Sequence, residues 1–282
     1  MKPTVILYFI DGLEAEASKK SALDIQDSLS GAASLLPLSR ENWVDPIRSL
    51  DPTTLCFLAT HGDIGENGTL QSFLESHSLR HTHSDATTSA LLTDKHATKL
   101  IYTALDIPTP SWKNMGTQFG EPVPHVSFLE KPRFGGSKRG IKHADSHNAN
   151  NNPEILYEEV IEGSYEISIP VLRDKDAHIA LSPIVRQRTT SDLGNLEDAN
   201  DSALKPEILQ YCQHQAARLS RALDCYGVTK TDFVINEKGD AFAIETDAIP
   251  GLCRTNATSL AANKAGITYD QLLKKIMETT TQ

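Results

Sequence analysis

Two stretches of the chain are each predicted to form a buried strand that leads into a polar loop and then a helix. "TVILYFI" (4–10) and "TLCFLA" (54–59) are continuous apolar runs of strand length, which are typical of parallel sheets covered on both faces. The first run is followed by "DGLEAEASKK" and a helical pattern to about Leu29, and the second by the glycine-rich "THGDIGENG" (60–68) and a helix. This order predicts a doubly wound α/β unit in the amino-terminal third, with ligand loops beyond the carboxyl ends of its strands.

The remaining two thirds alternate between helical and strand-like spacing. The predicted order is helix 86–108, strand 126–132, polar loop 146–153, two strands within 154–172 separated by a turn at Gly163, helix 206–227, a hairpin of "TDFVIN" and "AFAIET" around "EKGD", and a last helix from Tyr269 to Met277. Pro108 and Pro110 are expected to end the first of these helices. Residues 189–204 hold four acidic residues and neither Lys nor Arg, so this segment is predicted to be a long loop.

The composition narrows the class of protein. The chain has 282 residues, enough for two or three small α/β units with a core, and its formal net charge is −10, which disfavours nucleic acid as a partner. The longest apolar run, Val5–Ile10, is too short to span a membrane, and the start shows no signal-peptide layout. The four cysteines are scattered without C-x-x-C spacing, which argues for reduced thiols in a cytoplasmic protein.

Acidic residues gather at one end of the predicted hairpin. In "FAIETDAIPG" (242–251), Glu245 and Asp247 are two residues apart on a strand and therefore share a face, while Asp232 begins the strand before it. Like charges this close repel one another, and burial adds a desolvation cost, unless a cation lies between them. A hard divalent cation would satisfy all three carboxylates. Ordinary solvated acids at two strand ends are the alternative.

Cationic and acidic residues elsewhere suggest a phosphate and nucleotide site. Lys95 lies in the predicted 86–108 helix, and Lys131 ends a strand just before "GGSKRG", where glycine would let backbone amides approach phosphate oxygens. In "LYEEV" (156–160) the strand breaks at Glu158 and Glu159, which exposes backbone groups for an adenine edge, and Glu166 follows at a distance suited to ribose hydroxyls. Taken singly, each feature also fits an ordinary surface lysine, hairpin tip or charged strand end.

The ordered set of motifs resembles the D-alanine–D-alanine ligases of the ATP-grasp superfamily over most of the chain. The longest match is "HGDIGENGTLQSFLESHSLRHTHSDATTSALLTDKHATKL", which is similar to that family's His-Gly…Gly-Glu-x-Gly-Thr-x-Gln segment and the Asp-Lys…Thr-Lys helix after it. "EKPRFGGSKRG" resembles its phosphate loop, "TDFVINEKGDAFAIETDAIPGL" its Arg-x-Asp…Glu-x-Asn-x-x-Pro-Gly segment, and "ANKAGITYDQLLKKI" its closing helix.

This resemblance implies an ATP-grasp fold of three domains, in which two α+β domains hold ATP between them and an α/β domain precedes them. The expected division is 1–93, 94–168 and 169–282. ATP is then expected to be bound by Lys95, Lys131, Ser137, Glu158, Glu159, Val160 and Glu166. Mg²⁺, expected as two ions with Mn²⁺ as an alternative, is expected at Asp232, Glu245 and Asp247. The substrate is expected at Glu16, His61, Glu66, Arg254 and Asn256, with Lys230, Glu16 and Ser137 as the catalytic residues.

The resemblance also implies the reaction, and it has departures on the ATP side and on the acceptor side. We expect an ATP-dependent carboxylate–amine ligase that acts on an amino-acid-like substrate through an acyl phosphate, and ligases of this type are often homodimers. On the ATP side, Lys230 stands where the family has Arg and Asp247 where it has Asn. On the acceptor side, the acidic stretch 189–204 lacks the family's Tyr and Lys, and Asn256 aligns near the serine that anchors the second carboxylate. The acceptor departures favour a dipeptide or ring-closing ligase of secondary metabolism, such as antibiotic biosynthesis, over a D-alanine–D-alanine ligase of peptidoglycan synthesis. A nucleotide-binding homologue without catalysis is a third alternative.

Overall fold

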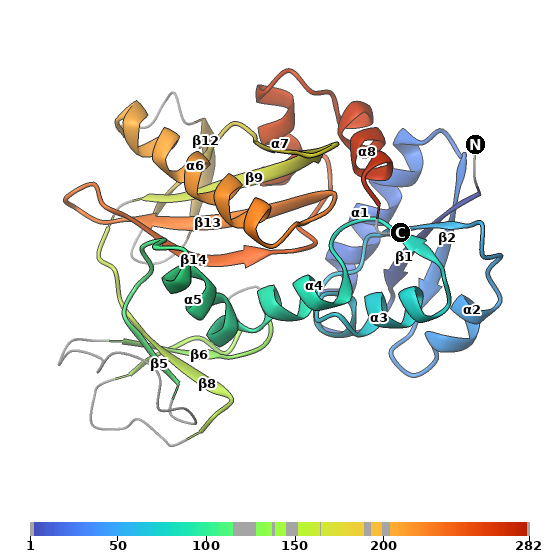
Figure 1. Cartoon of the computed structure of the whole chain (residues 1–282), viewed down its shortest axis with the longest axis horizontal. Coiled ribbons are helices and arrows are strands. Elements are labelled where there is room, and N and C mark those ends of the chain that lie inside the picture. Colours follow the sequence, from blue (N-terminus) through green and yellow to red (C-terminus); the bar gives the residue numbers. More distant parts are fainter. Residues whose placement is uncertain are drawn as a thin grey trace.

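Three β-sheets follow one another along the chain (Figure 1). The computed structural model describes residues 3–114, 128–136, 139–144, 152–163, 165–188, 193–198 and 204–280. Among these residues no helix is both long enough and apolar enough to cross a bilayer.

The first sheet is parallel and carries helices on both faces. Its strand order is β2-β1-β3-β4, and its elements are β1 (Thr4–Phe9), α1 (Ala15–Ser28), β2 (Ala33–Leu38), α2 (Val44–Arg48), β3 (Leu55–Leu58), a 3₁₀ turn (Asp63–Gly65), α3 (Thr69–Ser76) and β4 (Arg80–His81). Ile6 packs with α1 and the carboxyl-terminal helices on one side, while Leu7 packs with α3 on the other. The predicted doubly wound unit is therefore confirmed. The strands β2 and β4 were not predicted, because Pro37 interrupts one and the other has only two residues.

The single helix predicted over 86–108 is wrong, because the chain breaks at Asp94. Two helices result, α4 (Ala86–Thr93) and α5 (Lys95–Ala104), and α5 ends before either proline. Asp94 has extended backbone angles, and its carboxylate accepts hydrogen bonds from the backbone of His96 at 3.0 Å and Ala97 at 3.4 Å. This is a helix N-cap, which satisfies amides that the first turn of α5 leaves without partners.

The second sheet is antiparallel, with strand order β5-β8-β6-β7. It is built from β5 (Trp112–Asn114), β6 (Phe128–Pro132), β7 (Lys142–Ala144) and β8 (Ile155–Glu159). Most of the polar loop predicted over 146–153 lies outside the described residues. The turn predicted at Gly163 joins β8 to the third sheet, and a side chain there would meet the carbonyl oxygen of Ile235. Only glycine fits at that position.

The third sheet holds the predicted hairpin and is antiparallel. Its strands are β9 (Tyr165–Asp174), β10 (Ala177–Ala180), β11 (Ile184–Arg188), β12 (Leu193–Asp198), β13 (Val228–Ile235) and β14 (Ala241–Asp247), and the remaining helices are α6 (Pro206–Ala222), α7 (Ala257–Lys264) and α8 (Tyr269–Glu278). The hairpin, α6 and α8 confirm predicted elements, although α6 ends at Ala222 and not at 227, and α7 was not predicted. The loop predicted over 189–204 is wrong in part, since β12 pairs with β11 inside it.

Packing cuts across the domain division expected from the sequence. Tyr102 of α5 lies in the core of the third sheet, together with side chains of β9, β13 and α6. A boundary between residues 168 and 169 would divide β9, so we propose that the central unit ends before Tyr165.

His83 is a buried histidine in the first unit, and it gives a prediction for stability. Its side chain is 0% exposed, its Nε2 has no hydrogen-bond partner among the described residues, and burial lowers its pKa to about 3. An unfolded histidine binds a proton near its ordinary pKa of about 6.5, whereas folded His83 stays neutral. The free energy of unfolding should therefore fall as pH drops below about 6.5, by up to about 1.4 kcal/mol per pH unit from this residue.

Urea unfolding of the parent chain and of His83→Gln at pH 6.5 and pH 5.0 tests this prediction. The variant should lose part of the pH dependence, while His77→Gln, which changes an exposed histidine, should keep it. An unchanged slope in His83→Gln would show that His83 does not couple folding to protonation.

Candidate functional site

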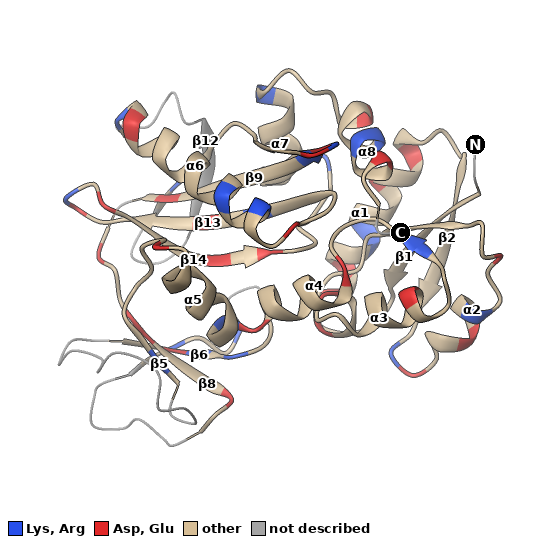
Figure 2. Cartoon of the chain, in the orientation of Figure 1, with Lys and Arg blue, Asp and Glu red and all other residues tan. Residues whose placement is uncertain are grey.

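The acidic residues predicted to meet at the hairpin do line one cavity. Asp232 on β13 pairs directly with Glu245 on β14, and Lys230 pairs with Asp247 two residues further along. An irregularity in the pairing follows Asp232, where the register shifts before Phe233. Figure 2 shows acidic residues toward the end of β14. All four of these ionisable side chains face a cavity of about 590 Å³ between the first and third sheets.

The ammonium of Lys230 lies among the carboxylates. Its Nζ is 2.5 Å from Asp232 and 2.9 Å from Asp247. Burial works against its charge, but the carboxylates of Asp232, Asp247 and Glu245 outweigh burial and raise the pKa of Lys230. Burial and the neighbouring Asp247 and Asp232 raise the pKa of Glu245 as well. The site therefore holds more negative charge than one lysine can compensate.

The donor chemistry suits a hard divalent cation. Asp232 is 4% exposed, and its Oδ1 has no hydrogen-bond partner among the described residues. This buried carboxylate oxygen is the kind of ligand that a hard cation prefers. Within the described residues, however, no three His, Cys, Asp or Glu side chains already surround a common point at metal-binding distance. The acids are arranged around Lys230 instead.

A second cluster couples Glu158 to two lysines. Glu158 on β8 is 2% exposed; it contacts Lys131 on β6 and lies 2.6 Å from Lys99 on α5. Burial opposes the charge of Glu158, but the two lysines hold its pKa below the ordinary value. Burial lowers the pKa of Lys99 to about 8. The Glu158 carboxylate opposes this decrease, and the ammonium of Lys131 adds to it. The cluster carries a net positive charge when all three groups are ionised, which suits a phosphate.

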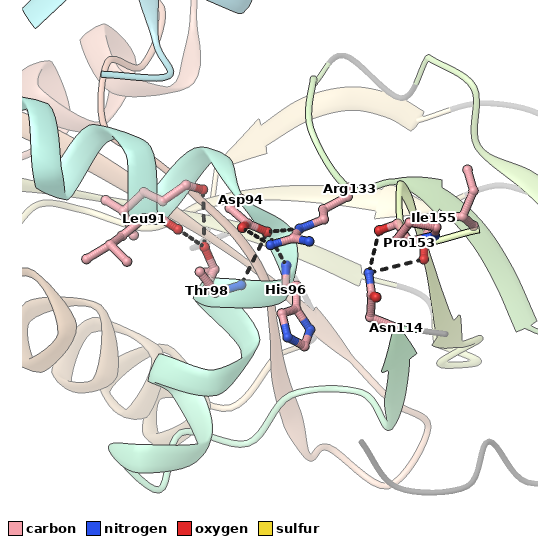
Figure 3. Close-up of polar contacts among 10 residues, drawn as sticks. Leu91, Asp94, His96, Thr98, Asn114, Arg133, Pro153 and Ile155 are labelled. Atoms are coloured by element: carbon pink, nitrogen blue, oxygen red, sulfur yellow. Dashed lines mark hydrogen bonds and ion pairs between the residues drawn. The ribbon is translucent and has the colours of Figure 1, made fainter. Parts of the chain in front are cut away.

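Figure 3 shows Asp94, at the break between α4 and α5, in contact with Arg133. Arg133 follows β6 and precedes the segment with Gly135, Gly136 and Gly140, which we call the glycine loop. The Arg133 guanidinium donates to both Asp94 oxygens, at 2.8 and 2.6 Å, and the Lys95 amide donates to the Arg133 carbonyl at 3.1 Å. The Lys95 ammonium contacts the carbonyl of Gly135. Burial lowers the pKa of Lys95, although nearby Glu245 opposes this. The base of the loop and the lysine are thus held together at the cavity.

The first unit supplies a polar cluster on the opposite wall. His61 Nδ1 lies 3.4 Å from Glu66, and its Nε2 lies 3.1 Å from the hydroxyl of Ser21 on α1. Burial raises the pKa of Glu66, while His61 opposes the rise. On the third sheet, Glu166 also lines the cavity. The cavity is therefore lined by acids and cations of the first unit, of α5 and of the third sheet, whereas Lys131 and Glu158 of the second sheet do not line it.

Several residues predicted from the sequence lie elsewhere. Glu16 is exposed on α1 and does not line the cavity, whereas Glu14, two residues earlier, does. The Arg254 guanidinium lies 3.0 Å from Asp27 and stacks on Tyr269, while Asn256 lines the cavity and caps α7.

The residues predicted to bind the nucleotide also lie in different places. Glu159 ends β8 and accepts a hydrogen bond from the Ser111 amide at 3.2 Å, and Val160 follows it at the exit from the sheet. Ser137 lies outside the described residues. Glu158 points into the lysine cluster, so only its backbone is left to meet a base.

Sequence reasoning missed Glu14, Lys99 and Arg186, all of which belong to the site or its support. Lys99 follows Lys95 by four residues, the spacing of one helix face, and this was the available signal. Glu14 had no comparable signal, because the start of α1 depends on the tertiary structure. Arg186 lies 3.9 Å from Glu166 on the neighbouring strand, which only the sheet register reveals.

Comparison with known proteins places this arrangement in a family. Residues 136–278, about half of the chain, match the family described as "D-ala D-ala ligase C-terminus". The chain belongs to the D-alanine–D-alanine ligase family. Similar proteins include the D-alanine–D-alanine ligase of Gloeobacter violaceus, 27% identical with 95% of this chain and 96% of that protein covered. The ligase of Marinobacter nauticus is 29% identical, with 96% of this chain and 88% of that protein covered.

The solved structures agree with the fold expected of this family. The D-alanine–D-alanine ligase from Bacillus anthracis complexed with ATP superimposes with a TM-score of 0.80 at 21% identity, covering 99% of this chain and 97% of that chain. The ATP-grasp fold predicted from the sequence is therefore confirmed. Membership of the family makes the chain an ATP-dependent, ADP-forming ligase that forms an amide bond.

Proposed function

We propose that this chain joins the carboxylate of an amino-acid-like substrate to an amine, through an acyl phosphate formed from ATP. The observation that carries the proposal is the shared cavity, in which Lys95 and Lys230 lie opposite the polar cluster of His61 and Glu66. A phosphate donor and an amino acid would meet there.

The proposed reaction has two steps. A substrate carboxylate oxygen attacks the γ-phosphorus of ATP, the bond to the β,γ-bridging oxygen breaks, and ADP leaves. The amine nitrogen then attacks the acyl carbon, inorganic phosphate leaves, and the nitrogen gives up a proton. Lys95 and Lys131 are proposed to offset the charge on the phosphates in both steps, and Lys230 to contact the transferred phosphoryl group. Ser137 is proposed to close over that group and exclude water.

The nucleotide is proposed to lie between the second and third sheets. The backbone of Glu158, Glu159 and Val160 would pair with the adenine edge, and Glu166 would accept from the ribose hydroxyls. Asp232, Glu245 and Asp247 are proposed to hold Mg²⁺, as two ions, or Mn²⁺ in its place. When bound, the metal neutralises phosphate charge and polarises the γ-phosphoryl group.

For the amino acid substrate, we assign the ammonium group to Glu14 in place of Glu16. The Glu14 side chain lies against Gly62 and reaches Gly136 of the glycine loop, so it stands between the first unit and the phosphate site. His61 and Glu66 would support the same group, and Asn256 would face the acceptor.

The relatives favour one particular pair of substrates as a second candidate. Proteins named D-alanine–D-alanine ligase match this chain over nearly its full length, which favours two D-alanines and peptidoglycan synthesis. The residues that differ from the family at the acceptor side, 189–204 and Asn256, favour another amine. The proposed role in secondary metabolism rests on these differences alone. One cavity holds the cations Lys95 and Lys230 together with the three proposed metal ligands, which argues against a homologue without catalysis. A homodimer in the cytoplasm remains a prediction.

Phosphate release from ATP and Mg²⁺, measured across D- and L-amino acids with mass spectrometry of the products, tests the function. Release that depends on an amino acid, with a product of the summed mass minus water, would support it. Two free D-alanines joined at the highest rate would select the second candidate. No release with any amino acid would overturn the proposal.

Lys131→Ala should weaken Mg–ATP binding at least tenfold without unfolding the chain. Its removal leaves Glu158 paired with Lys99 alone, so the cluster goes from one net positive charge to none and no buried charge loses its only partner. Calorimetric titration with Mg–ATP measures the change. Lys142→Ala, which removes an exposed lysine from the neighbouring strand, is the matched control. Equal affinities for the two variants would contradict the phosphate assignment.

A further inference from the structure

A second cavity of about 390 Å³ adjoins the reaction cavity on the side of the first sheet. It lies beyond the carboxyl ends of β1 and β2, under the glycine loop. The Arg139 guanidinium, four residues after Gly135, donates to the Leu13 carbonyl at 2.6 Å at the edge of this cavity. This cavity exceeds the volume of a methyl group many times over, and none of the roles assigned above uses it.

The polar groups around this second cavity already pair with one another. Asp11 accepts two hydrogen bonds from the Arg40 amide, at 3.0 and 3.1 Å, and the Arg40 guanidinium contacts Asp63. Arg139 is engaged by the Leu13 carbonyl. Apart from Glu14, His61 and the glycines, the rest of the lining is apolar, namely Phe9, Leu13, Ile64, Pro132 and Phe134. Leu13 is 72% exposed and Phe134 46%, which leaves apolar surface for a ligand to cover.

Glu14 stands at the junction of the two cavities. It lines both, together with His61 and the loop glycines. A methyl group added to Gly62 would lie 3.4 Å from the Glu14 side chain, and one added to Gly136 would lie 3.7 Å from its carboxylate. The absence of a side chain at Gly62 and Gly136 leaves room beside the Glu14 side chain.

We propose that the second cavity receives the side chain of the substrate whose ammonium Glu14 holds, and that this side chain is apolar and longer than that of alanine. The inference rests on the proposed function. An α-carbon with its ammonium at Glu14 and its carboxylate toward Lys95 has one heavy substituent left. The apolar cavity on the far side of Glu14 is the space open to it. The cavity thus selects a linear or branched aliphatic amino acid.

Calorimetric titration with a homologous series tests this inference without turnover. The probes are both enantiomers of alanine, 2-aminobutyrate, norvaline and norleucine, with Mg–ADP present. Each added methylene should lower Kd about fourfold, so norleucine of one enantiomer, with three more methylenes, should bind roughly 60-fold more tightly than alanine. Glutamate, of similar length but charged, should gain nothing. A Kd that is flat or rises with chain length overturns the inference, as does binding of none of the four.

Two variants and a control locate the effect. Leu13→Trp should cut the ratio of alanine Kd to norleucine Kd at least tenfold, and Ile64→Ala, which removes part of the apolar wall, should cut it several-fold. Leu23→Trp changes an exposed leucine of α1 that lines neither cavity, and it should leave the ratio unchanged. An equal ratio in all chains that keep the parent's thermal unfolding overturns the inference. If Kd falls with side-chain length but no amino acid triggers phosphate release, only the proposed function is refuted. If alanine is ligated but Kd does not depend on side-chain length, only this inference is refuted.

Discussion

Glu245→Gln should lower kcat at least about 100-fold while leaving the chain as stable as its parent or more stable. Glutamine keeps the volume of the side chain and removes one negative charge from the group formed with Asp232 and Asp247. A divalent cation bound by that group would lose a charged oxygen ligand, and phosphoryl transfer would lose the charge compensation that the cation provides. Folding would lose nothing, because burial and its acidic neighbours already disfavour the charged form of Glu245.

The opposite directions of these two effects make the test specific. Kinetics at saturating ATP and magnesium gives kcat, and urea unfolding gives the stability of the same preparation. Glu237→Gln, in the exposed turn of the same hairpin, is the control and should change neither. Asp247→Asn should be milder, about tenfold or less, because this side chain is 42% exposed and an amide oxygen can still bind a cation. Full activity of Glu245→Gln at the same magnesium concentration would rule out the acidic group as the metal site.

The parts of the fold that the sequence predicted are those in which local pattern and tertiary burial agree. The runs at 4–10 and 54–59 are apolar throughout because both faces of the parallel sheet are covered, and the hairpin is recognisable because two short apolar strands, whose side chains pack on α5 and α6, flank a turn of polar residues. The break at Asp94 escaped this reasoning, since Asp-Lys fits a helix interior by spacing. Its carboxylate instead caps the next helix and binds Arg133, a partner 39 positions away.

The candidate site was predictable where its residues share an element and not where elements must first be placed. Asp232, Glu245 and Asp247 follow from strand alternation and antiparallel pairing alone. The choice between Glu14 and Glu16 depends on where α1 begins and which side of it faces the loop, which the tertiary contacts of Gly62 and Gly136 decide. The pairing of Glu158 with Lys99 joins a strand of one sheet to a helix packed on another. No pattern within either segment indicates it.

Glu158→Gln should destabilise the chain by about 3–5 kcal/mol, the largest loss we expect from a change that conserves volume. Lys99 is 1% exposed and Lys131 8%, and Glu158 is the acid that both contact. A neutral amide would leave two ammonium groups close together with little water and no counter-charge. Lys99, whose pKa burial already lowers, would lose its proton first. Urea unfolding measures the loss, and Glu159→Gln is the matched control on the next residue of the strand.

A second substitution separates charge from packing. Lys99→Met in the Glu158→Gln chain removes one of the two stranded charges and keeps an apolar side chain of similar length, so most of the lost stability should return. Mg–ATP affinity should not return with it, because Lys131 would then have no carboxylate to hold its ammonium toward the phosphates. If the double variant is as unstable as Glu158→Gln alone, the loss comes from packing around residue 158 and not from uncompensated charge. Recovery of stability without recovery of ATP binding would assign Glu158 to positioning Lys131, with Lys99 as the second cation that keeps this buried acid ionised.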